Sequence, residues 1–383
     1  MYSSQYSNNE ILILFFSFLR TMMPINQLIS LLQPENVQVD SFNFKLHSKV
    51  TVAILLLSSL LACHGQFFSE PIQCTDIPGV SKQVVDSYCW THQIYLVTSK
   101  TAGHDGRDYA YPGVTAERSD VNDKRFLSYY PWVSLVLFLQ ALCFVLPNYL
   151  WKTILGDNIS SLMQHNLKSS GSESVQRNIE LDRLAKEWSN SRGAYGHLAV
   201  AYLACEALNL VNVVGQMFLI DRFLGHTFWT FGSDIIENSM MPAEVRVDVL
   251  SEVFPKMSKC SYWKYGPSGQ IDQLDTLCNL PINFLNEKVY IVLWFWLVCL
   301  ASMTTLYLAY LLTVILVPSL QIKIISSKLP RPANKDNVSF AVHSKKLNGV
   351  ERLGDWLVLN MLFSNLDKWT NGQIVERMNQ VLA

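Results

Sequence analysis

The sequence predicts an all-α membrane protein with four spans and a small disulfide-stapled α/β outer domain. Three observations support this fold class. Half of the 383 residues are hydrophobic and only 16% are charged, against about 25% in an average soluble domain. Apolar stretches of about 20 residues, long enough to cross a bilayer, recur four times. Between them lie two cysteine pairs, Cys74 with Cys89 and Cys260 with Cys278. The net charge of −1 argues against a nucleic-acid binder.

Each apolar stretch has features of a membrane span. Residues 50–68 and 132–150 contain no Lys, Arg, Asp or Glu. The second of these has aromatic residues at both ends, as is typical of a membrane interface. Residues 198–224 carry Glu206 within an apolar run, and residues 289–317 form the longest stretch. We therefore expect four transmembrane helices.

Four spans place both termini on the same side of the membrane. We divide the chain into an N-terminal segment with a pore helix (1–49), span 1 (50–68), outer loop 1 (69–131), span 2 (132–150), a cytoplasmic loop (151–197), span 3 (198–224), outer loop 2 (225–288), span 4 (289–317) and a cytoplasmic helical domain (318–383). Disulfides persist in oxidising compartments, and Lys and Arg favour the cytoplasm. The tail holds nine Lys/Arg against five Asp/Glu, so we expect a multi-pass plasma-membrane protein with cytoplasmic termini.

The four loop cysteines allow three connectivities, and the sequence alone does not choose among them. We interpret them as two staples that hold both outer loops as one rigid domain. The alternatives are four unpaired thiols or a zinc site, for which the usual ligand spacing is missing. Aromatic residues surround them and form either a docking surface or the core of the outer domain: Tyr88, Trp90, Tyr262, Trp263 and Tyr265.

Four polar residues in span 3 recur at helical spacing: Glu206, Asn209, Asn212 and Gln216. Steps of three or four residues place them on one helical face. Polar groups are costly in lipid, so that face should meet other helices or water. One hypothesis is a pore or gating stripe. The interpretation that we favour is hydrogen bonding between helices of the bundle.

The sequence offers little that could support catalysis. It contains no Gly-rich phosphate loop, no GxSxG and no HExxH, so we expect neither an enzyme nor a cofactor or metal site. Residues 181–188 and 349–382 have helical apolar spacing. They predict helices in the cytoplasmic loop and the tail.

Several motifs resemble those of the innexins, the gap-junction proteins of invertebrates. The run Tyr129-Tyr130-Pro131-Trp132-Val133 resembles the family signature YYQWV, and each outer loop has two cysteines, as in innexins. Further runs match along the chain: Cys205-Glu206-Ala207-Leu208-Asn209, Lys264-Tyr265-Gly266-Pro267-Ser268-Gly269 and Gly354-Asp355-Trp356. Pro131 replaces the usual Gln, which a helix start tolerates.

The resemblance implies a subunit of a ring, an octamer or a hetero-oligomer with other innexins, that docks with a ring on the adjacent cell. The resulting wide pore passes ions and small metabolites. The family pairs its loop cysteines crosswise, which implies Cys74 with Cys278 and Cys89 with Cys260. Innexins begin near Met22 or Met23, so we expect initiation there. The alternatives are an undocked hemichannel that releases small molecules and a four-span adhesion protein.

Overall fold

The computed structural model describes residues 40–92, 94–97, 111, 113–114, 124–169, 174–241, 249–330 and 349–382. The expected pore helix before residue 40 and the start at Met22 or Met23 lie outside them. The chain forms two compact units. Residues 52–142 and 213–299 belong to one of them, which we call the sheet unit. Residues 40–51, 143–212 and 300–382 belong to the other, which we call the tail unit.

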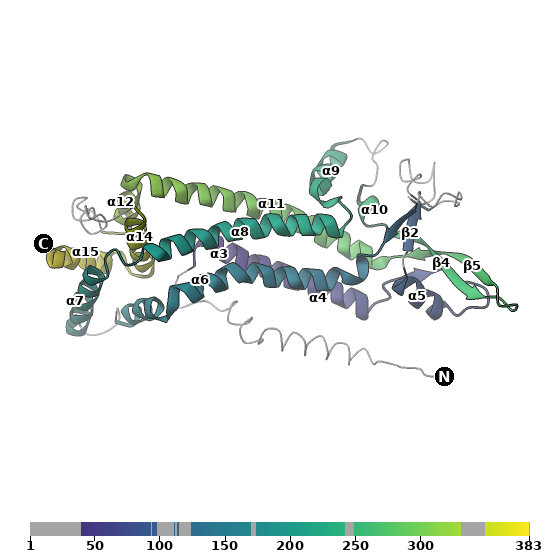
Figure 1. Cartoon of the computed structure of the whole chain (residues 1–383), viewed down its shortest axis with the longest axis horizontal. Helices are drawn as coiled ribbons and strands as arrows, with labels where there is room; N and C mark the ends of the chain where they lie inside the picture. Colours follow the sequence, from purple (N-terminus) through teal and green to yellow (C-terminus); the bar gives the residue numbers. More distant parts are fainter. Residues whose placement is uncertain are drawn as a thin grey trace. The chain divides into compact units, whose positions relative to one another are not determined.

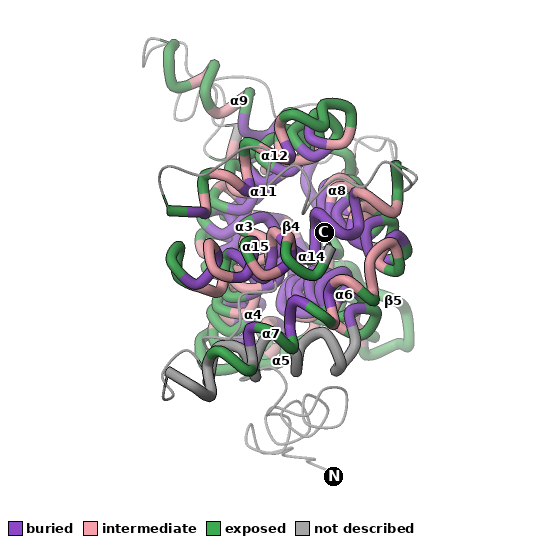
Figure 2. Tube along the Cα trace, turned by 90° about the vertical axis from the view of Figure 1, so that its left-hand side faces the viewer, coloured by how far each residue is buried: buried purple, intermediate pink, exposed green. Residues whose placement is uncertain are grey.

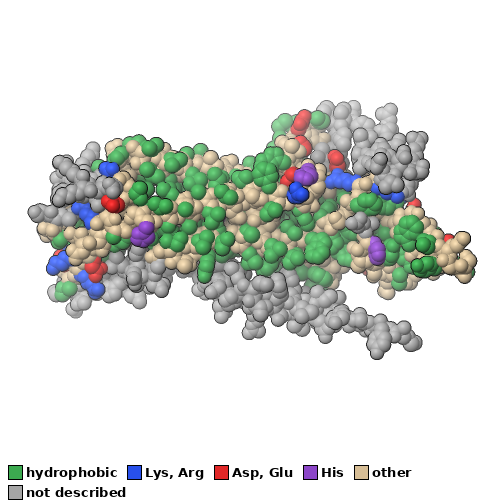
Figure 3. Space-filling view, viewed as in Figure 1, with side chains coloured by type: hydrophobic (Ala, Val, Ile, Leu, Met, Phe, Trp, Pro, Cys, Tyr) green, Lys and Arg blue, Asp and Glu red, His purple; other side chains and the backbone are tan. Residues whose placement is uncertain are grey.

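Four long helical stretches confirm the prediction of four helices able to span a membrane (Figure 1). They are a first stretch formed by α3 (Phe42–Lys45), the π-helix η1 (Leu46–Thr51) and α4 (Val52–Phe67), then α6 (Val133–Ser169), α8 (Gly196–Phe223) and α11 (Pro281–Leu316). Figure 3 shows hydrophobic side chains over much of the exposed face of these helices. Large exposed residues such as Leu57, Leu146 and Leu306 suit contact with lipid.

Two of these helices start eight residues earlier than the apolar windows suggested. The first helix begins at Phe42, because the Ser41 hydroxyl caps it by accepting from the Phe44 amide at 3.1 Å. The fourth begins at Pro281, a residue favoured in the first helical turn. At about 1.5 Å per residue, the 36 residues of α11 exceed the roughly 30 Å of a bilayer core. The ends of a helix therefore do not mark the surfaces of the membrane.

The sheet unit contains a five-stranded antiparallel sheet with strand order β1-β5-β4-β2-β3. Its strands are β1 (Gln73–Cys74), β2 (Ile94–Val97), β3 (Lys124–Leu127), β4 (Met257–Tyr265) and β5 (Ile271–Asn279). A turn with Gly269 at φ 82° closes the β4–β5 hairpin, and glycine adopts that backbone freely. Its short helices are α5 (Lys82–Thr91), η4 (Tyr130–Trp132), α9 (Phe228–Met240) and α10 (Val249–Val253).

The tail unit packs four further helices around an apolar core. They are α7 (Ser174–Asn190), α12 (Pro318–Ser327), α14 (Gly349–Asn365) and α15 (Lys368–Leu382). The helices predicted over 181–188 and 349–382 are thus confirmed, with a break where Asp367 caps α15 by accepting from the Thr370 amide at 3.0 Å. The core includes Trp188, Leu329, Trp356 and Met378. Buried and exposed positions alternate along α15, as expected where one side packs, whereas residues 353–359 of α14 are all buried (Figure 2).

Candidate functional site

Two disulfides join the segments that precede and follow the middle spans. Cys74 pairs with Cys278 across 204 residues, and Cys89 pairs with Cys260 across 171. This is the crosswise pairing that the resemblance implies. Cys74 and Cys278 face each other on β1 and β5, while Cys89 fastens α5 to β4. Three of these sulfurs lie within 4.8 Å of one another, but a disulfide leaves no thiolate to bind a metal.

The aromatic residues near the cysteines divide between the two interpretations left open above. Tyr88 packs edge-on against Tyr262 at 4.8 Å, and Trp90 packs against the buried Tyr130 at 4.8 Å, so these three partly buried rings contribute to packing within the unit. Trp263 and Tyr265, in contrast, are 51% and 79% exposed on the β4–β5 hairpin. The hairpin tip therefore offers aromatic surface to a partner.

The signature residues connect the start of span 2 to the sheet unit. Tyr130 is buried, and its hydroxyl lies 3.2–3.4 Å from the carbonyl oxygens of Cys89, Trp90 and His92, at the end of α5. The Tyr129 hydroxyl donates to the Val253 carbonyl at 3.0 Å.

Burial raises the pKa of Tyr129, which keeps this donor protonated. Pro131 occupies the first turn of η4, where its missing N–H leaves no bond unmade. Val133 is buried and Trp132 is exposed.

A buried polar network surrounds Glu206 in the tail unit. Its carboxylate accepts from Ser41 Oγ at 2.8 Å, from Asn43 Nδ2 at 2.7 Å and from Asn209 Nδ2 at 3.3 Å. Three donors satisfy a carboxylate that is fully buried. The network therefore ties the first helix to α8.

The network continues to the fourth helix. Thr304 Oγ1 lies 3.2 Å from Asn43 Oδ1 and 2.7 Å from His47 Nε2. Sequence reasoning missed Ser41, Asn43, His47 and Thr304. The i, i+4 spacing of Asn43 and His47 was the available signal.

The four polar residues predicted to lie on one face of span 3 all belong to α8, but they do not share one set of contacts. The structure brings Glu206 and Asn209 into the network, whereas Asn212 and Gln216 lie further along the helix, partly buried and buried. Hydrogen bonding between helices, the interpretation favoured above, describes the first two. A Glu206→Gln variant that assembles and conducts normally would remove the gating hypothesis.

The motif Gly354-Asp355-Trp356 anchors α14 to other parts of the tail unit. Both Asp355 carboxylate oxygens accept from the Gly193 amide, at 3.0 and 3.1 Å. Burial raises the pKa of the Asp355 carboxyl to about 6. Trp356 Nε1 donates to the Gln321 carbonyl at 3.3 Å. At Gly354, an added Cβ would lie 2.2 Å from the Tyr195 carbonyl oxygen, so only glycine allows this approach.

Together these features define a class: a four-span membrane protein with a disulfide-crosslinked sheet and a helical tail. Comparison with known proteins names the family. The sequence profile of the Innexin family matches residues 40–382. Innexin inx2 of Schistocerca americana is 36% identical over 340 residues, which cover 88% of this chain and 91% of the relative.

Two proteins of Drosophila melanogaster are also similar. Innexin shaking-B is 35% identical over 341 residues (88% of this chain, 89% of the relative). Innexin inx2 is 33% identical over 353 residues (92% and 94%). The chain belongs to the innexin family, whose members are gap-junction channel subunits and not enzymes.

Proposed function

We propose that this chain assembles as a ring, an octamer or a hetero-oligomer with other innexins, that docks with a second ring on the adjacent cell. The docked rings form a wide pore through which ions and small metabolites diffuse. The observation that carries the proposal is the sheet in which both cysteine-bearing segments meet, held by two disulfides. Docking favours surfaces that are already in their bound shape, because ordering them on contact weakens binding.

The β4–β5 hairpin is the part of the sheet unit best suited to meet the opposing ring. Its tip carries the exposed side chains of Trp263, Tyr265 and Ile271. Rigid aromatic side chains contribute contact area with little loss of conformational entropy. In our proposal these residues belong to the docking surface.

The proposed orientation places residues 69–131 and 225–288 outside the cell and both termini inside. Disulfides persist in an oxidising compartment, which supports the external position of the sheet. The excess of Lys and Arg after residue 317 supports an internal tail. Cysteine accessibility to an impermeant reagent, with single cysteines introduced at Tyr265 and Trp369, tests this orientation.

Junctional conductance between paired oocytes that express the chain tests the docking channel. We expect current between the cells, and we expect Cys74→Ala with Cys278→Ala to abolish it. The exposed thiol of Cys143 offers a matched control, since Cys143→Ser should retain the current.

Two other outcomes would replace the proposal with a rival. Dye uptake by single cells without junctional current would indicate a hemichannel that releases small molecules. Neither signal, despite normal surface expression, would favour a four-span adhesion protein. Co-expression with a second innexin then distinguishes adhesion from an obligate hetero-oligomer, because only the latter gains current.

A further inference from the structure

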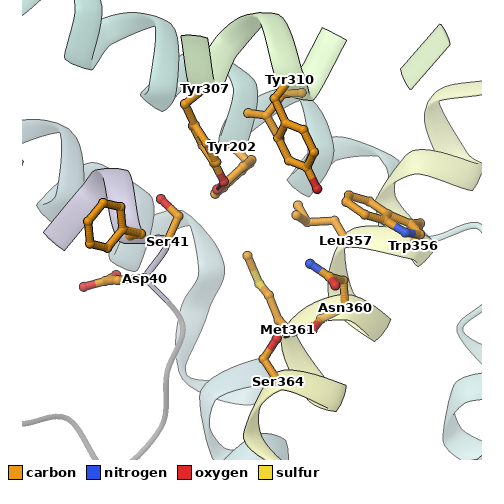
Figure 4. Close-up of a pocket in the computed structure, with 12 residues that line it drawn as sticks. Asp40, Ser41, Tyr202, Tyr307, Tyr310, Trp356, Leu357, Asn360, Met361 and Ser364 are labelled. Atoms are coloured by element: carbon orange, nitrogen blue, oxygen red, sulfur yellow. Dashed lines mark hydrogen bonds between the residues drawn. The ribbon is translucent and has the colours of Figure 1, made fainter. Parts of the chain in front are cut away.

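A half-open pocket of about 320 Å³ lies in the tail unit, where α3, α8, α11 and α14 meet (Figure 4). This volume is at the small end of the roughly 300–1,000 Å³ typical of ligand sites. Its lining is rich in aromatic and apolar side chains, among them Phe42, Tyr202, Tyr307, Tyr310, Trp356 and Met361. Because Ser41, Asn360 and Ser364 share this lining, such a site suits a small molecule with both apolar and polar parts.

Two polar groups on the lining are available to a ligand. Within the part of the chain that the structure describes, the Tyr310 hydroxyl and Asn360 Nδ2 make no hydrogen bond. They come from different helices, α11 and α14, and both point toward the same space in Figure 4. Both can donate, so they fit a ligand that presents oxygen acceptors.

The ionised groups around the pocket already have partners. Asp40 lies 3.5 Å from the Lys152 ammonium. Glu206, which accepts a hydrogen bond from the lining residue Ser41, has three donors in all.

Lys328 donates to the carbonyl and side-chain oxygens of Asn360 at 2.9 and 2.6 Å, and to Ser364 Oγ, which together use its three N–H donors. A charged ligand would lose its hydration without gaining an ionised group on the lining that is free to hydrogen-bond with it, which is unfavourable.

We propose that this pocket binds an uncharged amphiphile whose head carries hydroxyl or ester oxygens and whose hydrocarbon body contacts the aromatic lining. Monoacylglycerols have this chemistry, and they can come from the membrane or from water. Binding is a property of the single subunit, so it does not rest on docking or conduction.

Photolabelling of the purified full-length protein in detergent tests the ligand class. Three photoreactive probes share one hydrocarbon chain and differ in the head: a monoacylglycerol, a fatty acid and an alkylamine. We expect the monoacylglycerol to label α11 and α14 saturably, and the charged probes to need at least about tenfold higher concentration. Equal labelling by all three, or preferred labelling by a charged probe, would overturn the proposal.

Substitutions of residues that line the pocket test where the monoacylglycerol binds. Tyr310→Phe removes only a hydroxyl, and Asn360→Asp removes the free donor but keeps an oxygen for Lys328. Each should weaken binding about three- to tenfold, the worth of one hydrogen bond. Met361→Trp, which fills the pocket, should abolish it. Tyr149→Phe, at a tyrosine exposed elsewhere on α6, is the matched control and should bind normally.

Unchanged affinity in both Tyr310→Phe and Asn360→Asp would contradict the site. Competition by a short, water-soluble monoacylglycerol as strong as that by the long-chain form would identify a free metabolite. Competition by the long-chain form alone would identify a membrane lipid. Both results support the proposed chemistry.

Discussion

The two units hold distant segments together in different ways. In the sheet unit, two disulfides bridge 204 and 171 residues. In the tail unit, the described cysteines Cys143 and Cys205 are free thiols. There, apolar burial and a few hydrogen bonds, such as those of Asp355 and Trp356, hold α14 in place.

Disulfides persist in an oxidising compartment such as the extracellular space, which agrees with an outer position for the strands that carry them. Cys143 and Cys205 lie in the helices able to span a membrane, outside these strands. A sheet whose strands come from distant segments gains stability from crosslinks, because these restrict the unfolded chain. A larger helical cluster can be stabilised by its core alone. The contrast agrees with the proposed orientation, and the following experiments test each side of it.

The largest expected effect is the loss of a disulfide in the sheet unit. We expect Cys89→Ser with Cys260→Ser to lower the free energy of unfolding by about 2–5 kcal/mol. The change frees α5 from β4. Thermal unfolding followed by tryptophan fluorescence measures it, with Cys143→Ser as control. An unaltered melting temperature would show that the sheet does not depend on its crosslinks.

A single added methyl group should disrupt the tail unit next most strongly. Gly354→Ala places Cβ 2.2 Å from the Tyr195 carbonyl oxygen and 2.7 Å from the Gly196 nitrogen. Because both atoms belong to the backbone, they cannot turn aside, and we expect a loss of about 1–3 kcal/mol. The matched change Gly349→Ala, in the same helix, meets no atom closer than 3.9 Å. Equal melting temperatures for the two variants would contradict this close approach.

The pH dependence of the tail unit should report Asp355. Its pKa of about 6 in the folded state exceeds the value of about 3.9 for an unfolded chain. The folded state therefore binds this proton more tightly, and the resulting stability is present below about pH 4 and lost as pH rises through about 6.

Asp355→Asn removes this dependence. We expect the wild-type melting temperature to fall relative to the variant between about pH 4 and pH 7. Parallel curves for the two proteins would show that the carboxyl does not titrate in this range.

The smallest expected effect on stability comes from Tyr130, in the run that resembles the family signature. Tyr130→Phe removes the hydroxyl shared by the Cys89, Trp90 and His92 carbonyl groups. We expect a loss of about 0.5–1.5 kcal/mol, because the disulfides still hold α5. In the Cys89→Ser, Cys260→Ser background the same change should weaken the sheet unit more. Tyr265→Phe, at the exposed hairpin tip, serves as control. A larger loss of stability from Tyr130→Phe in the protein with both disulfides than in the Cys89→Ser, Cys260→Ser background would contradict this expectation.

Apolar length and helical spacing were enough to predict the four long helices and the tail helices. They could not predict the partners of a polar face. Periodicity places Glu206 and Asn209 on one side of α8, but Ser41 and Asn43 come from 165 and 163 residues away. The window without charged residues that we took as the first span starts at residue 50, after Lys49. The helix itself starts earlier and includes Asn43 and His47, whose burial depends on contacts made across the fold.

The sheet was harder still to predict. Strand β1 has only two residues, too few for any period, and its register opposite β5 depends on a partner 204 residues distant. The cysteine pairing came from the family resemblance. Neither the spacing of residues nor the family resemblance predicted the pocket, because its lining combines four separate helices.

The pairing of β1 with β5 has a mechanical consequence. Strand β1 follows closely after α4, and β5 ends at Asn279, just before α11 begins. At the same end of these helices Gly65 approaches Ile282 so closely that an added Cβ would lie 2.5 Å from its Cδ1. The strand pairing and this close packing therefore couple the first and fourth helices at one end. A rotation of one helix there would be transmitted to the other, so relative motion of the two is expected further from the sheet.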